Sequence, residues 1–188
     1  MEYAVLWFVL WGLLWAVYFT ADGFDLGVGI LLPVLGRDDT DRRVMIHTIG
    51  PVWDGNEVWL VTAAGATFAA FPGAYALLFS ALYTPMLLVL FALIVRGVGM
   101  EFRGKGTTES WKRRWDNAIS LSSTLIAFLF GVLFGNLFVG LPIDAAGYAG
   151  GWAGLLSLSG ILTGILFLLL FAVHGSLWLA WKTDGGLA

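Results

Sequence analysis

Long apolar stretches constrain the fold of this chain more than any other feature of its sequence. Five of them approach the ~20 residues that a helix needs to cross the hydrocarbon layer of a membrane. We place them near residues 3–35, 51–71, 74–96, 118–139 and 152–181. Only 12% of the 188 residues are charged, too few to cover a soluble surface. The sequence therefore predicts an all-α integral membrane protein of about five transmembrane helices, a four-helix bundle plus one further helix, forming a single domain over residues 1–188.

The basic residues fit one side of the membrane under this assignment. They are Arg37, Arg42, Arg43, Arg96, Arg103, Lys105, Lys112, Arg113, Arg114 and Lys182. The opposite loops, near residues 71–74 and 141–151, carry none. By the positive-inside rule we expect the N-terminus outside and the C-terminus in the cytoplasm. The first apolar stretch has no basic leader and no small-residue cleavage site, so we expect it to stay in the membrane.

Pairs of glycines four residues apart indicate close helix packing. Gly131 and Gly135 form one pair, and Gly160 and Gly164 form another. Small residues at this spacing let two helix backbones approach each other within a membrane. The pattern predicts a bundle and says nothing about function.

Several kinds of functional site are not supported by the residues present. The chain has no cysteine, and its net charge of −3 gives no footprint for nucleic acid. Of its two histidines, we place His47 in a charged loop and interpret His174 as a helix residue rather than a ligand. No nucleotide-binding loop, zinc motif or catalytic triad is present. We therefore assign no catalytic, metal or cofactor-binding residue to this chain.

Two acidic residues lie deep within the first apolar stretch. Asp25 is twelve residues before Arg37, which places it roughly 18 Å from the inner end of a helix. Asp22 precedes it by three residues and shares its face. Acids at this depth normally face protein or water and often carry protons. We favour a proton relay, and the alternative is that backbone groups or an arginine of a neighbouring helix satisfy both acids.

A second acidic cluster opens the next predicted helix, in the run Pro51-Val52-Trp53-Asp54-Gly55-Asn56-Glu57. Acids in a first helical turn are stabilised by the helix dipole, so Asp54 and Glu57 have an ordinary structural explanation. Asp54 also lies about one turn inside the cytoplasmic boundary, where it could take protons from water and pass them inward. The residues alone leave both interpretations open.

Several segments of the sequence form an ordered set of motifs. The segment Thr20-Ala21-Asp22-Gly23-Phe24-Asp25-Leu26-Gly27-Val28-Gly29 resembles the first-helix motif of subunit II of the cytochrome bd quinol oxidases. The segment Trp53-Asp54-Gly55-Asn56-Glu57-Val58-Trp59-Leu60 matches in the same order. Shorter matches follow at Leu35-Gly36-Arg37, Arg42-Arg43-Val44-Met45, Phe134-Gly135-Asn136-Leu137, His174-Gly175 and Lys182-Thr183-Asp184-Gly185. The matches extend from residue 20 to residue 185.

The resemblance implies a subunit of a terminal oxidase in a bacterial or archaeal plasma membrane, which oxidises quinol and reduces dioxygen to water. Haem b and haem d are then carried by the partner, subunit I. This chain would stabilise that subunit, supply a proton path and offer a structural quinone or lipid site. By motif, Asp25 and Asp54 look like acids of that path, with Trp53 and Asn56 around them. A small single-helix subunit is a further expected partner.

Family members are about twice as long as this chain, so we expect either the front half of a subunit or a split subunit completed by a second half or a second copy. Two other functions stay open. Buried acids are also typical of secondary transporters and proton channels. The other is a purely structural bundle, in which every acid is a packing element.

Overall fold

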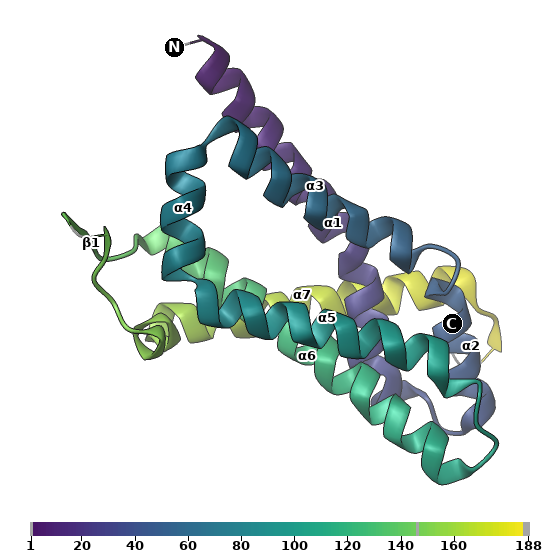
Figure 1. Ribbon diagram of the computed structural model, residues 1–188. Coiled ribbons are helices and arrows are strands. Elements are labelled where there is room, and N and C mark those ends of the chain that lie inside the picture. The colour runs from purple at the N-terminus through teal and green to yellow at the C-terminus, as the bar shows by residue number, and fades with distance from the viewer. Residues whose placement is uncertain (1, 146, 186–188) are drawn as a thin grey trace.

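The computed structural model describes residues 2–145 and 147–185 and is built almost entirely from helices (Figure 1). The elements are α1 (Glu2–Leu35), α2 (Asp39–Ile49), α3 (Trp53–Ala70), α4 (Pro72–Ala81), α5 (Tyr83–Arg103), α6 (Glu109–Val139), β1 (Ile143–Asp144), β2 (Gly147–Tyr148), a short 3-10 helix (Trp152–Leu156) and α7 (Leu158–Lys182). The expected all-α class is confirmed.

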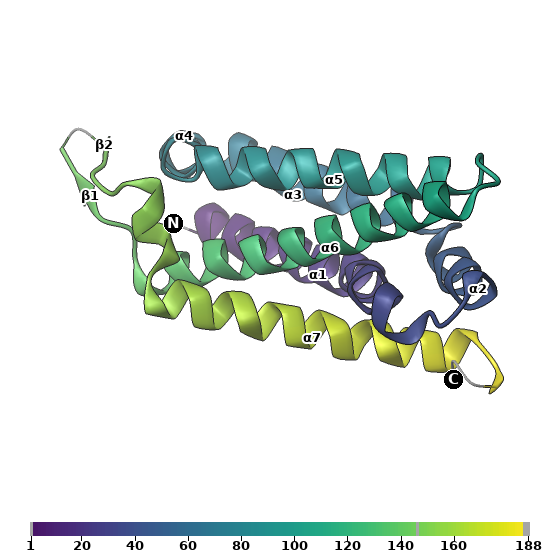
Figure 2. The ribbon, with the colours of Figure 1, turned by 90° about the horizontal axis from the view of Figure 1, so that it is seen from below.

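The long helices pack around α1 and α6. Helix α1 contacts α3, α6 and α7, while α6 packs along both α5 and α7. Helix α4 crosses from the end of α3 to the start of α5 (Figure 1). Figure 2 shows α2, the α5–α6 turn and the C-terminus at one end, with α4 and the β1–β2 hairpin at the other. We call the first of these the basic end, because nine of the ten Lys and Arg residues lie there; the tenth, Arg96, lies deeper.

Within the described residues, four helices are long and apolar enough to cross a membrane: α1, α5, α6 and α7. Helix α1 is unbroken over 34 residues, a length of about 50 Å, as expected from its sequence. Helix α3 corresponds to the second predicted span, 51–71, and forms at that place, but it does not meet this standard. Its first turns carry Asp54, Asn56 and Glu57, which lower its apolar character.

The helix predicted at residues 74–96 is divided in two. Helix α4 ends at Ala81, and α5 starts at Tyr83 after Leu82 leaves helical geometry with φ −103° and ψ 14°. Pro85 explains the break, because it has no N–H to donate to Ala81 and its ring would clash with that carbonyl group. Helix α5 then continues to Arg103, a full two turns beyond the predicted end.

Two further helices start at other residues than predicted, and one predicted loop residue lies in a helix. The helix expected at 118–139 begins at Glu109, where the Thr108 side chain caps it. The stretch 152–181 is a 3-10 turn followed by α7, with Ser157 capping the new helix through the Gly160 N–H. His47 was placed in a loop, and this was wrong. It lies in α2, whose first turn is capped by the Asp38 carboxylate accepting from the Asp41 N–H at 2.8 Å.

The glycine pairs lie at close helix crossings. A methyl group added at Gly131 would come within 2.6 Å of the Gly164 Cα atom, so α6 and α7 meet backbone to backbone as predicted. A second crossing joins α1 to α7, where a methyl group at Gly27 would lie 2.8 Å from the Gly175 Cα atom. These contacts fix α7 against the stretch of α1 that carries the two buried acids.

Candidate functional site

Helix α1 supplies one side of a buried polar cluster. Tyr18, Asp22 and Asp25 follow at spacings of four and three residues, so they share one helix face. All three side chains are fully buried. The Tyr18 hydroxyl donates to Asp22 Oδ2 at 3.0 Å. The prediction that Asp22 and Asp25 face protein rather than lipid is therefore confirmed.

Arg96 of α5 joins this face of α1 to α3. Its Nη1 atom lies 3.2 Å from Asp22 Oδ1 and donates to Glu57 Oε1 at 2.8 Å. The Arg96 side chain is completely buried, whereas the Glu57 side chain keeps 23% of its surface exposed. One guanidinium group thus links two carboxylates from two other helices.

Asn56 holds Asp25 from the first turn of α3. Its Nδ2 atom donates to Asp25 Oδ2 at 2.7 Å and to the Ala21 carbonyl at 3.1 Å. This contact fixes the start of α3 against α1 and orients the Asp25 carboxyl group. Asn56 therefore lies beside Asp25, one of the two acids of the first helix.

Trp53 and Asp54 lie at the edge of the cluster. The half-buried Trp53 ring faces Gly97 of α5, where an added methyl group would be 3.2 Å from the ring. Asp54 is exposed in the first turn of α3 and lies three residues before Glu57. The structure thus brings Asp22, Asp25 and Glu57 together around Arg96 and leaves Asp54 outside, one turn away.

The cluster contains more acid than base and has free hydrogen-bonding capacity. Asp25 lies within electrostatic range of Arg96, so three carboxyl groups surround one guanidinium group. Among the described residues, Asp25 Oδ1 and the Nε and Nη2 atoms of Arg96 have no hydrogen-bond partner. Buried polar atoms nearly always have partners, so these atoms mark positions where water would bind. An arrangement of this kind can hold and exchange protons.

Arg96 and Tyr18 were missed at the sequence level. Arg96 was assigned to the basic end because it was taken as the last residue of the 74–96 helix. The sequence contained a signal that Arg96 lies inside the helix: Arg103, seven residues later, is the cation that ends α5. A basic residue two turns inside an apolar helix calls for a buried acidic partner.

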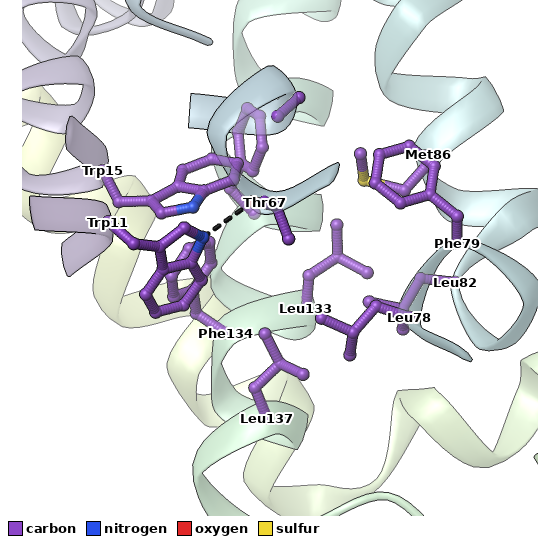
Figure 3. Close-up of a pocket in the computed structure, with 12 residues that line it drawn as sticks. Trp11, Trp15, Thr67, Leu78, Phe79, Leu82, Met86, Leu133, Phe134 and Leu137 are labelled. Carbon is purple, nitrogen blue, oxygen red and sulfur yellow. Dashed lines mark hydrogen bonds between the residues drawn. The ribbon is translucent and has the colours of Figure 1, made fainter. Parts of the chain in front are cut away.

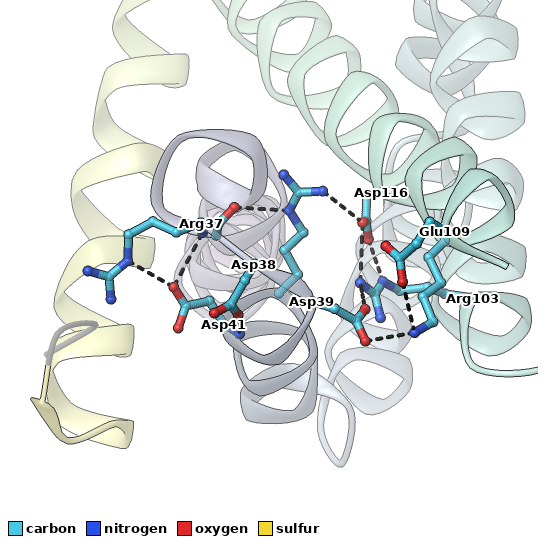
Figure 4. Close-up of polar contacts among 10 residues, drawn as sticks. Arg37, Asp38, Asp39, Asp41, Arg103, Glu109 and Asp116 are labelled. Carbon is cyan, nitrogen blue, oxygen red and sulfur yellow. Dashed lines mark hydrogen bonds and ion pairs between the residues drawn. The ribbon is translucent and has the colours of Figure 1, made fainter. Parts of the chain in front are cut away.

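A second polar group lies at the basic end and fixes α2 (Figure 4). Arg103 contacts both Asp116 of α6 and Asp39 of α2, and Lys112 donates to Asp39 Oδ2 at 2.7 Å. Arg42 adds a contact to Asp116 at 3.3 Å. Hydrogen bonding from Lys112, more than from Arg103, lowers the pKa of Asp39 below its usual value. The network joins α2, α5 and α6 away from the buried cluster.

An apolar cavity lies at the opposite end, beside α4 (Figure 3). Trp11 donates to the Thr67 hydroxyl at 2.7 Å on one side of it, and Leu78, Phe79 and Leu82 lie on the other. Its volume of about 50 Å³ is far below that of pockets for small organic ligands. A wider apolar groove of about 340 Å³ adjoins it between α3 and α5.

The described residues contain no group of three or more His, Asp and Glu side chains placed to hold a metal ion. His47 lies on α2 at the basic end, and His174 lies on α7. The His174 ring lies edge-on to Phe24, with ring centres 5.7 Å apart.

Comparison with known proteins identifies relatives. The chain is 48% identical over 123 residues to "Cytochrome bd ubiquinol oxidase subunit 2" of Bacillus subtilis (strain 168), covering 65% of this chain and 36% of that protein. It is 47% identical over 126 residues to "Cytochrome bd-I ubiquinol oxidase subunit 2" of Escherichia coli (strain K12), covering 65% of this chain and 33% of that protein. The matched region thus spans about a third of the length of these relatives.

A family model gives the broader assignment. The model for cytochrome bd terminal oxidase subunit II matches residues 3–188, nearly the whole chain. The four long apolar helices agree with a multi-pass membrane protein. The chain therefore belongs to the cytochrome bd terminal oxidase subunit II family.

Proposed function

We propose that this chain acts within a cytochrome bd-type quinol oxidase, where it stabilises the haem-bearing subunit I and conducts protons for the reduction of dioxygen by quinol. The observation that carries the proposal is the buried cluster of Asp22, Asp25 and Glu57 around Arg96, one helical turn from exposed Asp54. The oxidase context is supported by the relatives, which are named as subunits of cytochrome bd ubiquinol oxidases. Haem b and haem d would reside in the partner subunit.

The proton path starts at the basic end of the molecule. Asp54 is exposed there, and Glu57 lies one turn deeper with part of its side chain exposed. Arg96 connects Glu57 to Asp22, and Asn56 orients Asp25 beside them. Three carboxyl groups around one arginine offer more than one site at which a proton can be held within the membrane. Water at the unpaired atoms of Asp25 and Arg96 would link these groups.

Support for subunit I would come from the exposed apolar helix faces. Val5, Phe8 and Val9 on α1, and Leu169 and Leu177 on α7, are each more than half exposed. In a membrane such faces contact lipid or neighbouring helices. The partner subunit would cover part of them, and a small single-helix subunit or a second half of this subunit could cover others.

Oxygen consumption by the purified oxidase tests the proton path. We expect Asp54→Asn and Asp25→Asn to slow quinol-driven oxygen consumption several-fold, because each change removes a proton-carrying group while keeping its size. The reduced-minus-oxidised haem spectrum should stay normal. Glu109→Gln is the matched control, since this acid lies at the same end with its side chain 81% exposed, and it should keep full turnover.

Two outcomes favour the other interpretations. Normal turnover in both Asp25→Asn and Asp54→Asn, with lower thermal stability, would make the acids packing elements. Purification of the chain alone, without haem, together with proton or substrate uptake into vesicles, would favour a transporter or proton channel.

The groove between α3 and α5 suits a quinone or lipid chain. The groove of about 340 Å³ between α3 and α5 is lined by apolar side chains such as Leu60, Val61 and Leu90, with Tyr83 at its edge. These residues suit an isoprenoid or acyl chain. We propose this groove as the structural quinone or lipid site.

A further inference from the structure

A separate pocket of about 710 Å³ lies at the basic end, between α2 and the last turn of α7. Arg43 and His47 come from α2, and Trp178 and Lys182 come from α7. Each pair is four residues apart, so each presents two side chains on one helix face. The turn between α2 and α3 completes the wall. The volume is within the range of pockets that bind small organic groups.

The charge in this pocket is unbalanced. Its lining contains two permanent cations and a histidine, and no carboxylate lines it among the described residues. The Lys182 ammonium group lies over the rings of Trp178 and Trp181, at 5.0 and 4.3 Å from their centres. Arg42, the neighbour of Arg43, points the other way and reaches Asp116. The α2 helix thus has compensated charges on its α6 side and uncompensated ones on its α7 side.

The pocket also lies where a lipid headgroup would be. Lys182 ends the apolar span of α7, and tryptophans at such a position sit at the headgroup level of a membrane. Leu177 and Val173, five and nine residues before Lys182 on α7, are 63% and 57% exposed. At 100° per residue they lie on other faces of α7 than Lys182, so the acyl chains would bend around this apolar helix while a phosphate group enters the pocket. Basic pockets between helices at the cytoplasmic face are suited to anionic lipid headgroups.

We propose that Arg43, His47 and Lys182 bind the phosphate of an anionic phospholipid. The lipid would tie α2 to α7 at the cytoplasmic face, and it would do so away from the acidic cluster. Neither Arg43 nor Lys182 takes part in the proton path, so the proposal stands independently of it.

Native mass spectrometry of the purified, delipidated complex tests this site. The complex is titrated with phosphatidylglycerol, and the bound lipids are counted. We expect one high-affinity site, with affinity about 30-fold weaker in the Arg43→Gln/Lys182→Gln variant, because each cation near an anionic lipid contributes about fivefold. The control Lys105→Gln/Arg114→Gln removes the same charge from exposed positions on the α5–α6 side and should change the affinity less than twofold.

Further measurements make the test decisive. Val44→Glu places a carboxylate at the pocket wall and should weaken phosphatidylglycerol binding while both cations and the unfolding temperature are kept. Equal weakening in the pocket variant and the control would show general charge attraction and overturn the proposal, as would unchanged binding in both. Displacement of phosphatidylglycerol by excess inorganic phosphate at constant ionic strength would identify a free-anion site and overturn the lipid assignment.

Discussion

Arg96 joins two of the three acids of the buried cluster. It is fully enclosed and contacts Asp22 of α1 and Glu57 of α3. Removing one partner of a buried ion pair leaves uncompensated charge and costs about 3–5 kcal/mol. We therefore expect Arg96→Met to lower the free energy of unfolding by about that amount, measured by denaturant unfolding of the purified protein in detergent.

Two further variants separate the loss of charge from the loss of volume. Arg113→Met removes an exposed cation and should change the unfolding free energy by about 0.5 kcal/mol or less. Arg96→Met/Asp22→Leu removes both charges of one pair and should recover part of the stability. An unfolding free energy for Arg96→Met equal to that of the natural protein would contradict the ion pairs described here.

The sequence identified most acids of the site but not which residues of other helices they contact. Depth along an unbroken helix was enough to place Asp22 and Asp25, because helical rise is constant. The hydrogen bond from Asn56 to Asp25 depends on how α3 packs on α1, and no local pattern encodes that. Arg96 was missed for a related reason, since the end of its helix was placed two turns too early.

At the scale of elements, the crossing of α1 and α7 depends on glycine. A methyl group at Gly27 would overlap the Phe171 carbonyl and lie 2.8 Å from the Gly175 Cα atom. We expect Gly27→Ala to destabilise the protein by about 1–3 kcal/mol through overpacking. Gly12→Ala on the same helix meets nothing within 4 Å and should be neutral or stabilising by up to about 1 kcal/mol. Thermal unfolding of both variants in detergent measures the difference, and an equal effect of the two would rule out a tight crossing.

Helix α2 should be held in a pH-dependent way through Asp39. Its pKa is lowered mainly by Lys112, so the charged form is favoured in the folded protein. The resulting stabilisation is present above the ordinary carboxyl pKa of about 4 and is lost as the pH falls through the lower folded value. We expect Asp39→Asn to lower the unfolding temperature at pH 7, with the difference vanishing in acid below the folded pKa.

An exposed acid at the same end provides the control for that experiment. Glu101→Gln, in the last turn of α5, should leave the unfolding temperature close to that of the natural protein at both pH values. A difference between Asp39→Asn and the natural protein that is the same at pH 7 and in acid would show that the contact with Lys112 does not depend on charge.

Elements were predictable where one physical cause dominates. Apolar length placed α1 and the end of α7 closely. Pro85 could have indicated the α4–α5 break, because proline disfavours a continuous helix there. Helix α2 was harder to predict. It has few apolar residues, and it is held by Asp38 capping and by Asp39 contacts to α5 and α6, of which only the cap is local in sequence.

At the scale of the whole molecule, the separation of charge between the two ends predicts orientation. Arg42, Arg103 and Lys112 gather at the basic end, while the β1–β2 hairpin lies at the other (Figure 2). The positive-inside rule then puts the hairpin outside the cell.

The chain has no cysteine, so Ala145→Cys and Thr107→Cys, both at exposed positions, each introduce one reactive thiol. A membrane-impermeant maleimide applied to intact cells should label Ala145→Cys but not Thr107→Cys, and inside-out vesicles should give the opposite. The reverse pattern would place Asp54 on the outside and remove the cytoplasmic entry of the proposed proton path.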